Sequence, residues 1–350
     1  MIAYYIIFIF LFIFAINSKD YLSQRYLSNG IVYFGVFLVL FSGLRYEVGG
    51  DWWNYLRNFE DLLPYTSYNN LFFHDDPGFW FLAYFMYDIG LDIYGINIVV
   101  AIIFIYGLYR LLRQQPNPWL GLAVAFPYLI IVVSMGYVRQ AAAIGFIMLG
   151  ISYLRDKSFI KFIVSVFFAT IFHKTAILMI GIGMFQDGRG KFFRLIALLL
   201  IGMGMWSAFL AQDQANLIKN YVDAQMQSTG AMIRVMMNAL PALLLFYTRK
   251  TWKRLFNDYT FWKMIALGSI ATLFLLSIAS TAVDRMALYF IPIQVVVFSR
   301  LPLLLEGKIL KKLTKLFIVS YYLVVMVIWL NLGTHAKFWL YHNILFYDLF

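Results

Sequence analysis

The chain has 350 residues, of which 63% are hydrophobic, 20% are aromatic and only 13% carry a charge. Its mean hydropathy of +0.77 predicts an integral membrane protein and excludes a soluble globular enzyme. The absence of cysteine excludes disulfides, thiolate metal sites and a cysteine nucleophile.

Apolar stretches of about 15 to 20 residues recur along the chain, and each is long enough to cross a hydrocarbon core of ~30 Å as a tilted or slightly short helix. We therefore predict an all-α polytopic membrane protein with about 12 transmembrane helices, forming a single domain over residues 1–350. Hydropathy and the placement of Lys and Arg put these spans near 2–16, 30–44, 92–109, 119–134, 140–154, 159–172, 175–186, 192–211, 231–247, 264–282, 285–300 and 316–332.

Most of the 28 Lys and Arg residues fall in loops that this arrangement places in the cytoplasm, as the positive-inside rule requires. The formal net charge of +11 is therefore mainly a topology signal and an attraction to anionic membrane lipids. No nucleic-acid partner is implied.

The apolar stretch 159–186 is predicted to be a hairpin of two short helices. Its flanks RDKSFIK and DGRGKFFR are both basic, so both belong in the cytoplasm and the chain must turn round between them. His173 and Lys174 then lie at the outer tip. Segment 79–91 is too short to span and is predicted to lie at the outer interface or to enter the membrane part way, within an extracytoplasmic loop over residues 45–91. The aromatic tail 333–350 is predicted to form an interfacial helix.

Five cations lie at the mouths of spans on the side that topology disfavours: Arg45, Arg139, Lys174, Arg234 and Arg285. Charged groups at such depth usually line a bundle interior or a wet cavity. Arginine offers a planar fork to phosphate oxygens and lysine a point charge, so we predict that the five bind a diphosphate. Simple snorkelling to the headgroups, an orienting role for Arg234 and a pair between Arg285 and Asp284 are the alternatives.

The stretch GLRYEVGGDWWNYLRNFED, residues 43–61, supplies further candidates. Its two glycines permit a tight turn beside Asp51, and Trp52, Trp53 and Tyr55 are suited to sugar faces or to the membrane interface. An aromatic belt around a solvated acidic loop is the alternative. The remaining acids of the loop are interpreted as loop surface: Glu47, Glu60, Asp61, Asp75 and Asp76.

Asp51 and His173 are the two candidates for a general base. Imidazole can accept a proton near neutral pH, although a histidine bonded to a helix carbonyl would look the same in sequence. No pair of the form H-x-x-x-H or E-x-x-H lies on one helix, so we predict no protein-bound metal and no cofactor. Asp75 and Asp76 could hold a hard cation only weakly.

Several segments, in order along most of the chain, resemble the Wzy/EpsG family of polysaccharide polymerases. They are LRYEVGGDWWNY, GYVRQAAAIGFIMLGISYL, FHKTAIL, STAVDRMALYF and FWLYHNILF. The second segment places Gln140 beside Arg139, where it is expected to contact sugar or lipid. The chain departs from the family pattern at Leu340-Tyr341, where a proline-tyrosine pair is usual.

The resemblance implies a metal-independent, inverting membrane glycosyltransferase of the GT-C class. It would transfer a growing O-antigen or exopolysaccharide from undecaprenyl diphosphate onto the sugar hydroxyl of another carrier-linked repeat unit. The expected location is the bacterial cytoplasmic (inner) membrane, with the active site facing outward, and a chain-length regulator protein is an expected partner.

Two other functions are consistent with parts of the sequence. A lipid-linked oligosaccharide flippase or other transporter would place polar groups near mid-membrane and often shows repeats, whereas the unusual charges here gather at one face. A membrane O-acyltransferase that modifies the polysaccharide needs a deep catalytic histidine with a polar partner, a role that His173 alone meets poorly.

Overall fold

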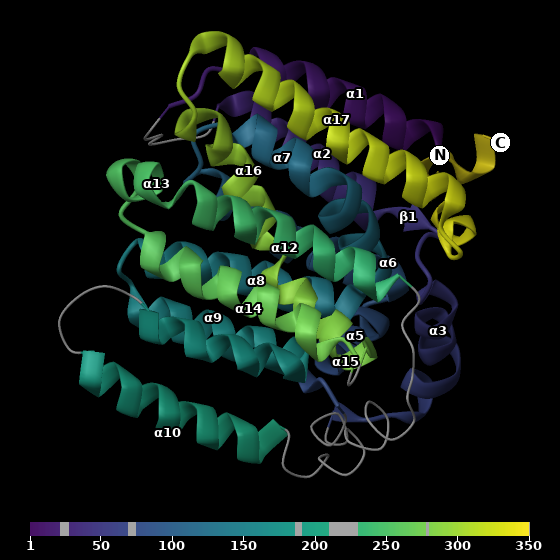
Figure 1. Cartoon of the computed structure of the whole chain (residues 1–350). Coiled ribbons are helices and arrows are strands. Elements are labelled where there is room, and N and C mark those ends of the chain that lie inside the picture. The colour runs from purple at the N-terminus through teal and green to yellow at the C-terminus, as the bar shows by residue number, and fades with distance from the viewer. Residues whose placement is uncertain (22–27, 69–74, 186–190, 210–229, 278–279, 350) are drawn as a thin grey trace.

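The computed structural model describes every residue except 22–27, 69–74, 186–190, 210–229, 278–279 and 350. The described part is a nearly all-α bundle, shown in Figure 1. Its first half contains α1 (Ile2–Asn17), α2 (Asn29–Gly43), β1 (Arg45–Tyr46), α3 (Trp52–Arg57), η1 (Asn58–Leu62), η2 (Leu63–Tyr65), α5 (Pro77–Asp88), α6 (Asp92–Leu112), α7 (Pro118–Ala125), η3 (Phe126–Ser134), α8 (Val138–Arg155) and α9 (Phe159–Phe172).

The second half is likewise helical. It contains η4 (Lys174–Phe185), α10 (Lys191–Phe209), α12 (Ala231–Tyr247), α13 (Arg249–Leu255), α14 (Tyr259–Leu275), α15 (Ser280–Ala287), η7 (Leu288–Phe290), α16 (Pro292–Leu304), α17 (Lys308–Leu332), η8 (Ala336–Trp339), β2 (His342–Asn343) and η9 (Ile344–Leu349). Every stretch that the sequence predicts as a span therefore overlaps a helical segment.

Length and composition identify fewer spans than the twelve predicted. Among the described residues, α6 and α17 are long and apolar enough to cross a membrane, and the number rises to four if two bent pairs each count as one span. These pairs are α12 with α13, bent by 76°, and the helix Ser280–Phe290 with α16, bent by 44°. Further apolar helices are shorter: α1, α2, the continuous Pro118–Ser134, α9 and α14.

Two irregularities in the helices coincide with prolines. Pro127 lies in the π-helix η3, and Pro292 follows the bend before α16. Proline lacks the N–H that a helix interior needs, so it frees a carbonyl and locally changes the helix path. Pro241, in contrast, lies inside α12 without ending it.

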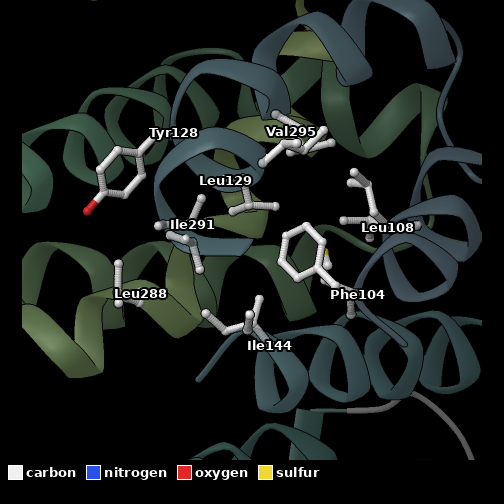
Figure 2. Close-up of a cluster of buried hydrophobic side chains, with 14 of the residues drawn as sticks. Phe104, Leu108, Tyr128, Leu129, Ile144, Leu288, Ile291 and Val295 are labelled. Atoms are coloured by element: carbon white, nitrogen blue, oxygen red, sulfur yellow. The ribbon is translucent and has the colours of Figure 1, made fainter. Parts of the chain in front are cut away.

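The core of the bundle lies where α6, η3, α8 and α16 meet. Figure 2 shows Phe104, Leu129, Ile144 and Val295 converging from these four elements. Helices α6 and α8 approach closely at Gly107 and Gly145: a Cβ atom on Gly107 would lie only 2.1 Å from the carbonyl oxygen of Gly145. Small residues let membrane helices approach in this way.

One end of the bundle carries β1, α3, α5 and α15 together with both chain termini, and we call it the loop end (Figure 1). The short helix α13 lies at the opposite end. Within the predicted extracytoplasmic loop, segment 79–91 forms most of α5, which packs against α6 and α9.

The C-terminal tail differs from the predicted interfacial helix. It forms two 3₁₀ helices and the strand β2, which pairs antiparallel with β1 so that Arg45 lies opposite Asn343. The Trp339 indole donates to the Ile131 carbonyl at 2.8 Å, and the side chain is only 3% exposed. The tail is therefore built into the loop end, because Trp339 bonds to η3 and strand β2 pairs with β1.

Candidate active site

Asp51 lies in a tight turn at the loop end, directly before α3. Gly49 makes this turn possible: its φ is 111°, and a Cβ atom there would lie 2.4 Å from the Met135 carbonyl oxygen. The Gly49 N–H also donates to the Phe338 carbonyl at 2.8 Å, so the tail holds the turn. Burial raises the pKa of the Asp51 carboxyl, although the charges of Arg139 and Arg285 act in the opposite direction.

Asp76 is buried at the loop end and has polar contacts with three residues. The prediction that it lies on the loop surface is therefore wrong. It is only 3% exposed. Its Oδ2 accepts from Arg139 Nη1 at 3.0 Å and lies 3.3 Å from His173 Nδ1, while Oδ1 accepts from the Lys174 backbone N–H at 2.9 Å. The carboxylate thus joins the turn before α5, the start of α8 and the tip between α9 and η4.

The partners of Asp76 also set its protonation state. Burial alone would raise the pKa of this carboxyl, but the hydrogen bond and charge of His173, the charge of Arg139 and the backbone N–H of Lys174 outweigh it. The pKa of Asp76 is therefore held below its usual value. An ionised carboxylate is the form that suits these donors.

The predicted hairpin tip is present. His173 ends α9 in an extended conformation and Lys174 begins η4, with α9 and η4 packed together. Lys174 Nζ contacts Asp75 Oδ1 at 3.0 Å. Among the described residues, His173 Nε2 is buried and has no hydrogen-bond partner.

A comparison with protein-family models matches residues 28–343 of this chain to the EpsG family. The matched range covers the whole cluster around Asp51, Asp76 and His173. This chain belongs to the EpsG family. Membership indicates a polysaccharide polymerase-type function, because EpsG proteins are broadly glycosyltransferase-like polymerases. No curated protein and no solved structure was found to match.

The other cations of this EpsG chain differ in their surroundings. Arg285 on α15 is exposed, and Gln140 Nε2 donates to its backbone carbonyl at 2.7 Å. Gln140 is 4% exposed, so it holds α15 against α8 and presents no free face to a sugar. Arg234 forms a two-bonded pair with Asp284, with nitrogen–oxygen distances of 2.7 and 2.6 Å. Asp284, considered in the sequence as a partner of Arg285, therefore binds Arg234.

Arg45 is placed differently from the prediction that it binds a diphosphate. It is 2% exposed and donates from Nε to Val48 O, from Nη1 to Ser42 O and from Nη2 to Asn97 Oδ1. These three acceptors are internal to the protein, so the guanidinium ties the end of α2 to α6 and to the following turn. The buried geometry gives Arg45 a structural role.

The three predicted aromatic contacts also separate by exposure. Trp52 is 4% exposed and packs near Tyr46 and Tyr94, and Tyr55 is 9% exposed beside the Arg139 guanidinium. Trp53 is 50% exposed. Of these three rings, only that of Trp53 is exposed enough to contact a ligand.

An apolar cleft of about 300 Å³ opens beside the charged cluster. It is lined by η4, α14 and the bend after α15, with Met179, Met264, Gly268, Met286, Tyr289 and Phe290 among its walls. The Tyr289 hydroxyl lies 3.1 Å from Thr175 Oγ1, and Met286 follows Arg285 in the chain. One wall of the cleft therefore includes a tyrosine whose hydroxyl contacts Thr175, the residue after Lys174.

Within the described ranges, no group of three or more His, Asp or Glu side chains is placed to hold a metal ion. Asp75 and Asp76, the two acids considered for weak cation binding, instead contact Lys174, Arg139 and His173. Sequence reasoning missed Asp76, Asp284 and Tyr289 as members of the cluster. A signal existed for Asp76, because Asp before Pro is a common start of a helix, and α5 begins at Pro77.

Proposed function

We propose that this chain is a polysaccharide polymerase that transfers a growing glycan from undecaprenyl diphosphate onto the sugar hydroxyl of another carrier-linked repeat unit. The observation that carries the proposal is the position of Asp51 and Asp76 among three cations, Arg139, Arg285 and Lys174, at one end of a membrane bundle. Family membership supports the same reaction class.

The proposed chemistry needs two kinds of group. The acceptor hydroxyl attacks the anomeric carbon, its proton passes to a base, and the bond to the diphosphate breaks with its electron pair leaving on the phosphate oxygen. Negative charge then grows on the diphosphate, and positioned cations stabilise it more than in the ground state. Arg139 and Arg285 are the proposed ligands for this charge, with Lys174 as a further point charge. Arg45 and Arg234 are not included, because Arg45 is buried against three internal acceptors and Arg234 gives two hydrogen bonds to Asp284. Arg139 also bonds to Asp76, but its side chain is 38% exposed.

Two further features support the lipid-linked substrate and the outward orientation. The apolar cleft beside Tyr289 is suited to the isoprenoid part of the carrier. The basic helix α13, with sequence RKTWKRL, lies at the end opposite the loop end. The positive-inside rule then puts the loop end outside the cytoplasmic membrane. We propose a twelve-span, GT-C-like topology and a metal-independent, inverting reaction on these grounds.

One specific observation favours the acyltransferase as a second candidate. His173 has the polar partner that the sequence did not reveal, since Asp76 lies 3.3 Å from its Nδ1. EpsG-family membership favours the polymerase. Ester formation on a purified glycan, in place of carrier-linked ladders, would decide for the acyltransferase.

The deciding experiment is a polymer-ladder assay with purified chain and carrier-linked repeat units. The wild type should form ladders, and Arg139→Ala and Arg285→Ala should form none while still folding. Arg249→Ala is the matched control, because Arg249 is an exposed arginine at the start of α13. Movement of the carrier without new glycosidic bonds would instead indicate a flippase. Normal ladders from both loop-end variants would contradict the proposed site.

A further inference from the structure

The imidazole of His173 is held in one orientation by a carboxylate that the sequence placed on the surface. Its backbone N–H donates to Ala169 O at 2.9 Å and its carbonyl accepts from Ala176 N at 2.9 Å, so the residue is anchored on both sides. The ring nitrogen Nδ1 faces Asp76 Oδ2 at 3.3 Å. Hydrogen bonds in catalytic pairs are often this long before substrate binds.

The pairing with Asp76 selects a tautomer. An ionised carboxylate accepts hydrogen bonds but cannot donate one, so the proton of a neutral His173 must lie on Nδ1. Nε2 is then left with a lone pair. Nε2 is buried and has no hydrogen-bond partner among the described residues. Leaving a buried polar atom without a hydrogen bond destabilises the folded state. An incoming hydroxyl group would supply the missing hydrogen bond.

The backbone around Asp76 is built to hold this carboxylate in place. Asp76 has a φ of 59° and is followed by Pro77, a left-handed conformation that non-glycine residues seldom adopt and that clusters at functional sites. A Cβ atom on Gly78 would lie 2.8 Å from Ile171 Cγ1, so the turn is pressed against the last turn of α9. His173 follows that turn directly. The two segments are therefore fixed relative to each other.

We propose that Asp76 is the positioning residue of an Asp76–His173 pair, in which His173 Nε2 takes the proton of the acceptor sugar hydroxyl. The proposal rests on the glycosyl transfer proposed above. As the hydroxyl oxygen bonds to the anomeric carbon, its proton moves to Nε2, and the electron pair of the breaking bond leaves with the diphosphate. The Asp76 carboxylate stabilises the imidazolium that forms, so no other reactant is needed.

Other charged groups surround the pair and enter any pH dependence. They are Arg139 from α8, Lys174 from the start of η4 and Asp75 from the turn before α5, with the Tyr289 hydroxyl of η7 beside Thr175. Arg139 also binds Asp76, and Lys174 donates its backbone N–H to it. A purely structural role, in which Asp76 only caps η4, is the competing explanation. The experiment must separate the two.

The test is a double-mutant cycle with purified chain in the ladder assay. Asp76→Asn and His173→Ala should each lower kcat by about 10²- to 10⁴-fold with KM changed only a few-fold. In the His173→Ala background, Asp76→Asn should cost far less activity than in the wild type, because the imidazole is gone and only the bond of Asp76 to Arg139 is then changed. Asp61→Asn, an exposed acid in the same loop, is the matched control and should keep wild-type rates.

The pH profile gives a second readout that a structural role would not move. The wild type should lose kcat/KM on the acid side as the base is protonated, and this limb should disappear in His173→Ala. Asp76→Glu, which restores a carboxylate, should recover part of the activity lost in Asp76→Asn. Equal losses from Asp76→Asn in both backgrounds, with an unchanged acid limb in His173→Ala, would overturn the proposal. A wild type that forms no product would instead contradict the polymerase function itself.

Folding of each variant is followed separately by thermal unfolding of the purified chain. If Asp76→Asn does not accumulate, Gly78→Ala serves as the second variant. Its added Cβ atom meets Ile171, so it shifts the same turn without changing the Asp76 carboxylate. This variant should lower kcat in the wild-type background and have little effect in His173→Ala. The same fractional loss in both backgrounds would count against the positioning role.

Discussion

Arg234 on α12 and Asp284 on α15 form a two-bonded ion pair, with Nε to Oδ1 at 2.7 Å and Nη2 to Oδ2 at 2.6 Å. The planar fork of arginine fits a carboxylate in this way, so the pair fixes the angle between the two helices. Because α15 also carries Arg285, we expect Arg234 to affect the proposed site by positioning Arg285.

The first prediction follows from that fork. Arg234→Lys keeps the charge but loses the second hydrogen bond, so it should lower activity by reducing the precision with which Arg285 is held. We expect a partial loss of ladders and a modest fall in thermal stability. Arg285→Ala should abolish ladders with stability little changed. Indistinguishable kinetics for the two variants would contradict these separate roles.

The second prediction concerns Arg45, whose donors bond to Ser42 O, Val48 O and Asn97 Oδ1. Arg45→Ala would leave buried acceptors without partners, each at a cost of about 1–3 kcal/mol. The variant should therefore unfold at a clearly lower temperature and accumulate poorly. Arg139→Ala, with a side chain 38% exposed, should accumulate normally. A stable Arg45→Ala protein without activity would restore Arg45 to the diphosphate ligands.

The contrast between these arginines shows what sequence could and could not predict. Hydropathy and basic flanks located the helices and the tip at His173, because membrane insertion follows patterns that are local in the chain. The same pattern put Arg45 and Arg139 at similar depth. It contained no information on whether their partners would be internal oxygens or an open site.

Asp76 shows the same limit for acids. The stretch HDDPGF resembles an exposed turn, and only the packing of α5 against α9 brings its carboxylate to His173, 97 positions later in the chain. Contacts between residues so far apart depend on how helices pack, which local periodicity does not encode. Gly49 was foreseeable because its requirement is local: the turn needs a positive φ.

The third prediction uses the opposite pKa shifts of the two loop acids. The pKa of Asp51 is raised by burial, so its ionised form costs stability at neutral pH and Asp51→Asn should raise the thermal midpoint or leave it unchanged. The pKa of Asp76 is lowered, so its ionised form stabilises the folded state. This stabilisation is fully present above the pKa of Asp in the unfolded chain, about 3.9, and is lost as the pH falls through the lower pKa of the folded state.

Thermal unfolding measured from pH 7 downward tests both signs. Asp76→Asn should unfold at a lower temperature than the wild type at pH 7, and this difference should shrink as the medium becomes acid. Asp51→Asn should show no such loss at pH 7, while its ladders decline. If Asp51→Asn unfolded at a lower temperature than the wild type at pH 7, the argument that burial raises the pKa of Asp51 would be wrong.

The fourth prediction concerns a network at the opposite end of the bundle. Arg300 has a side-chain exposure of 0% and donates to Asp258 Oδ1 and Oδ2 at 2.8 and 2.9 Å. Burial alone would raise the pKa of Asp258, but the charge and hydrogen bonds of Arg300 outweigh it and lower this pKa. Asp258→Asn should cost about 3–5 kcal/mol, because it leaves a buried cation uncompensated.

The readouts for Asp258→Asn are the thermal midpoint and the activity per folded molecule. The thermal midpoint should fall sharply. The activity per folded molecule should stay near the wild-type value, because the network is remote from the loop end. Lys312→Ala, an exposed cation on α17, is the control and should change neither. Lost activity at an unchanged midpoint would mean that this network takes part in turnover.

The fifth prediction tests the apolar cleft as the site of the carrier's isoprenoid chain. A Cβ atom on Gly268 would lie 2.8 Å from Phe290 Cζ, so Gly268→Leu displaces that ring and fills the cleft. Gly204→Leu is the matched control, because a Cβ atom at Gly204 of α10 meets nothing within 4 Å. Both changes replace a helical glycine with leucine, so effects on helix propensity are matched.

Activity is then compared on carriers with long and short isoprenoid chains. Filling the cleft removes apolar contact only for the part of the chain that occupies it, so Gly268→Leu should raise KM for the long carrier and have little effect on a short one. The wild type and Gly204→Leu should both prefer the long carrier. An equal rise in KM for both carriers would mean that Gly268→Leu disturbs Tyr289 and the polar site, and the isoprenoid chain would then have to lie elsewhere on the bundle.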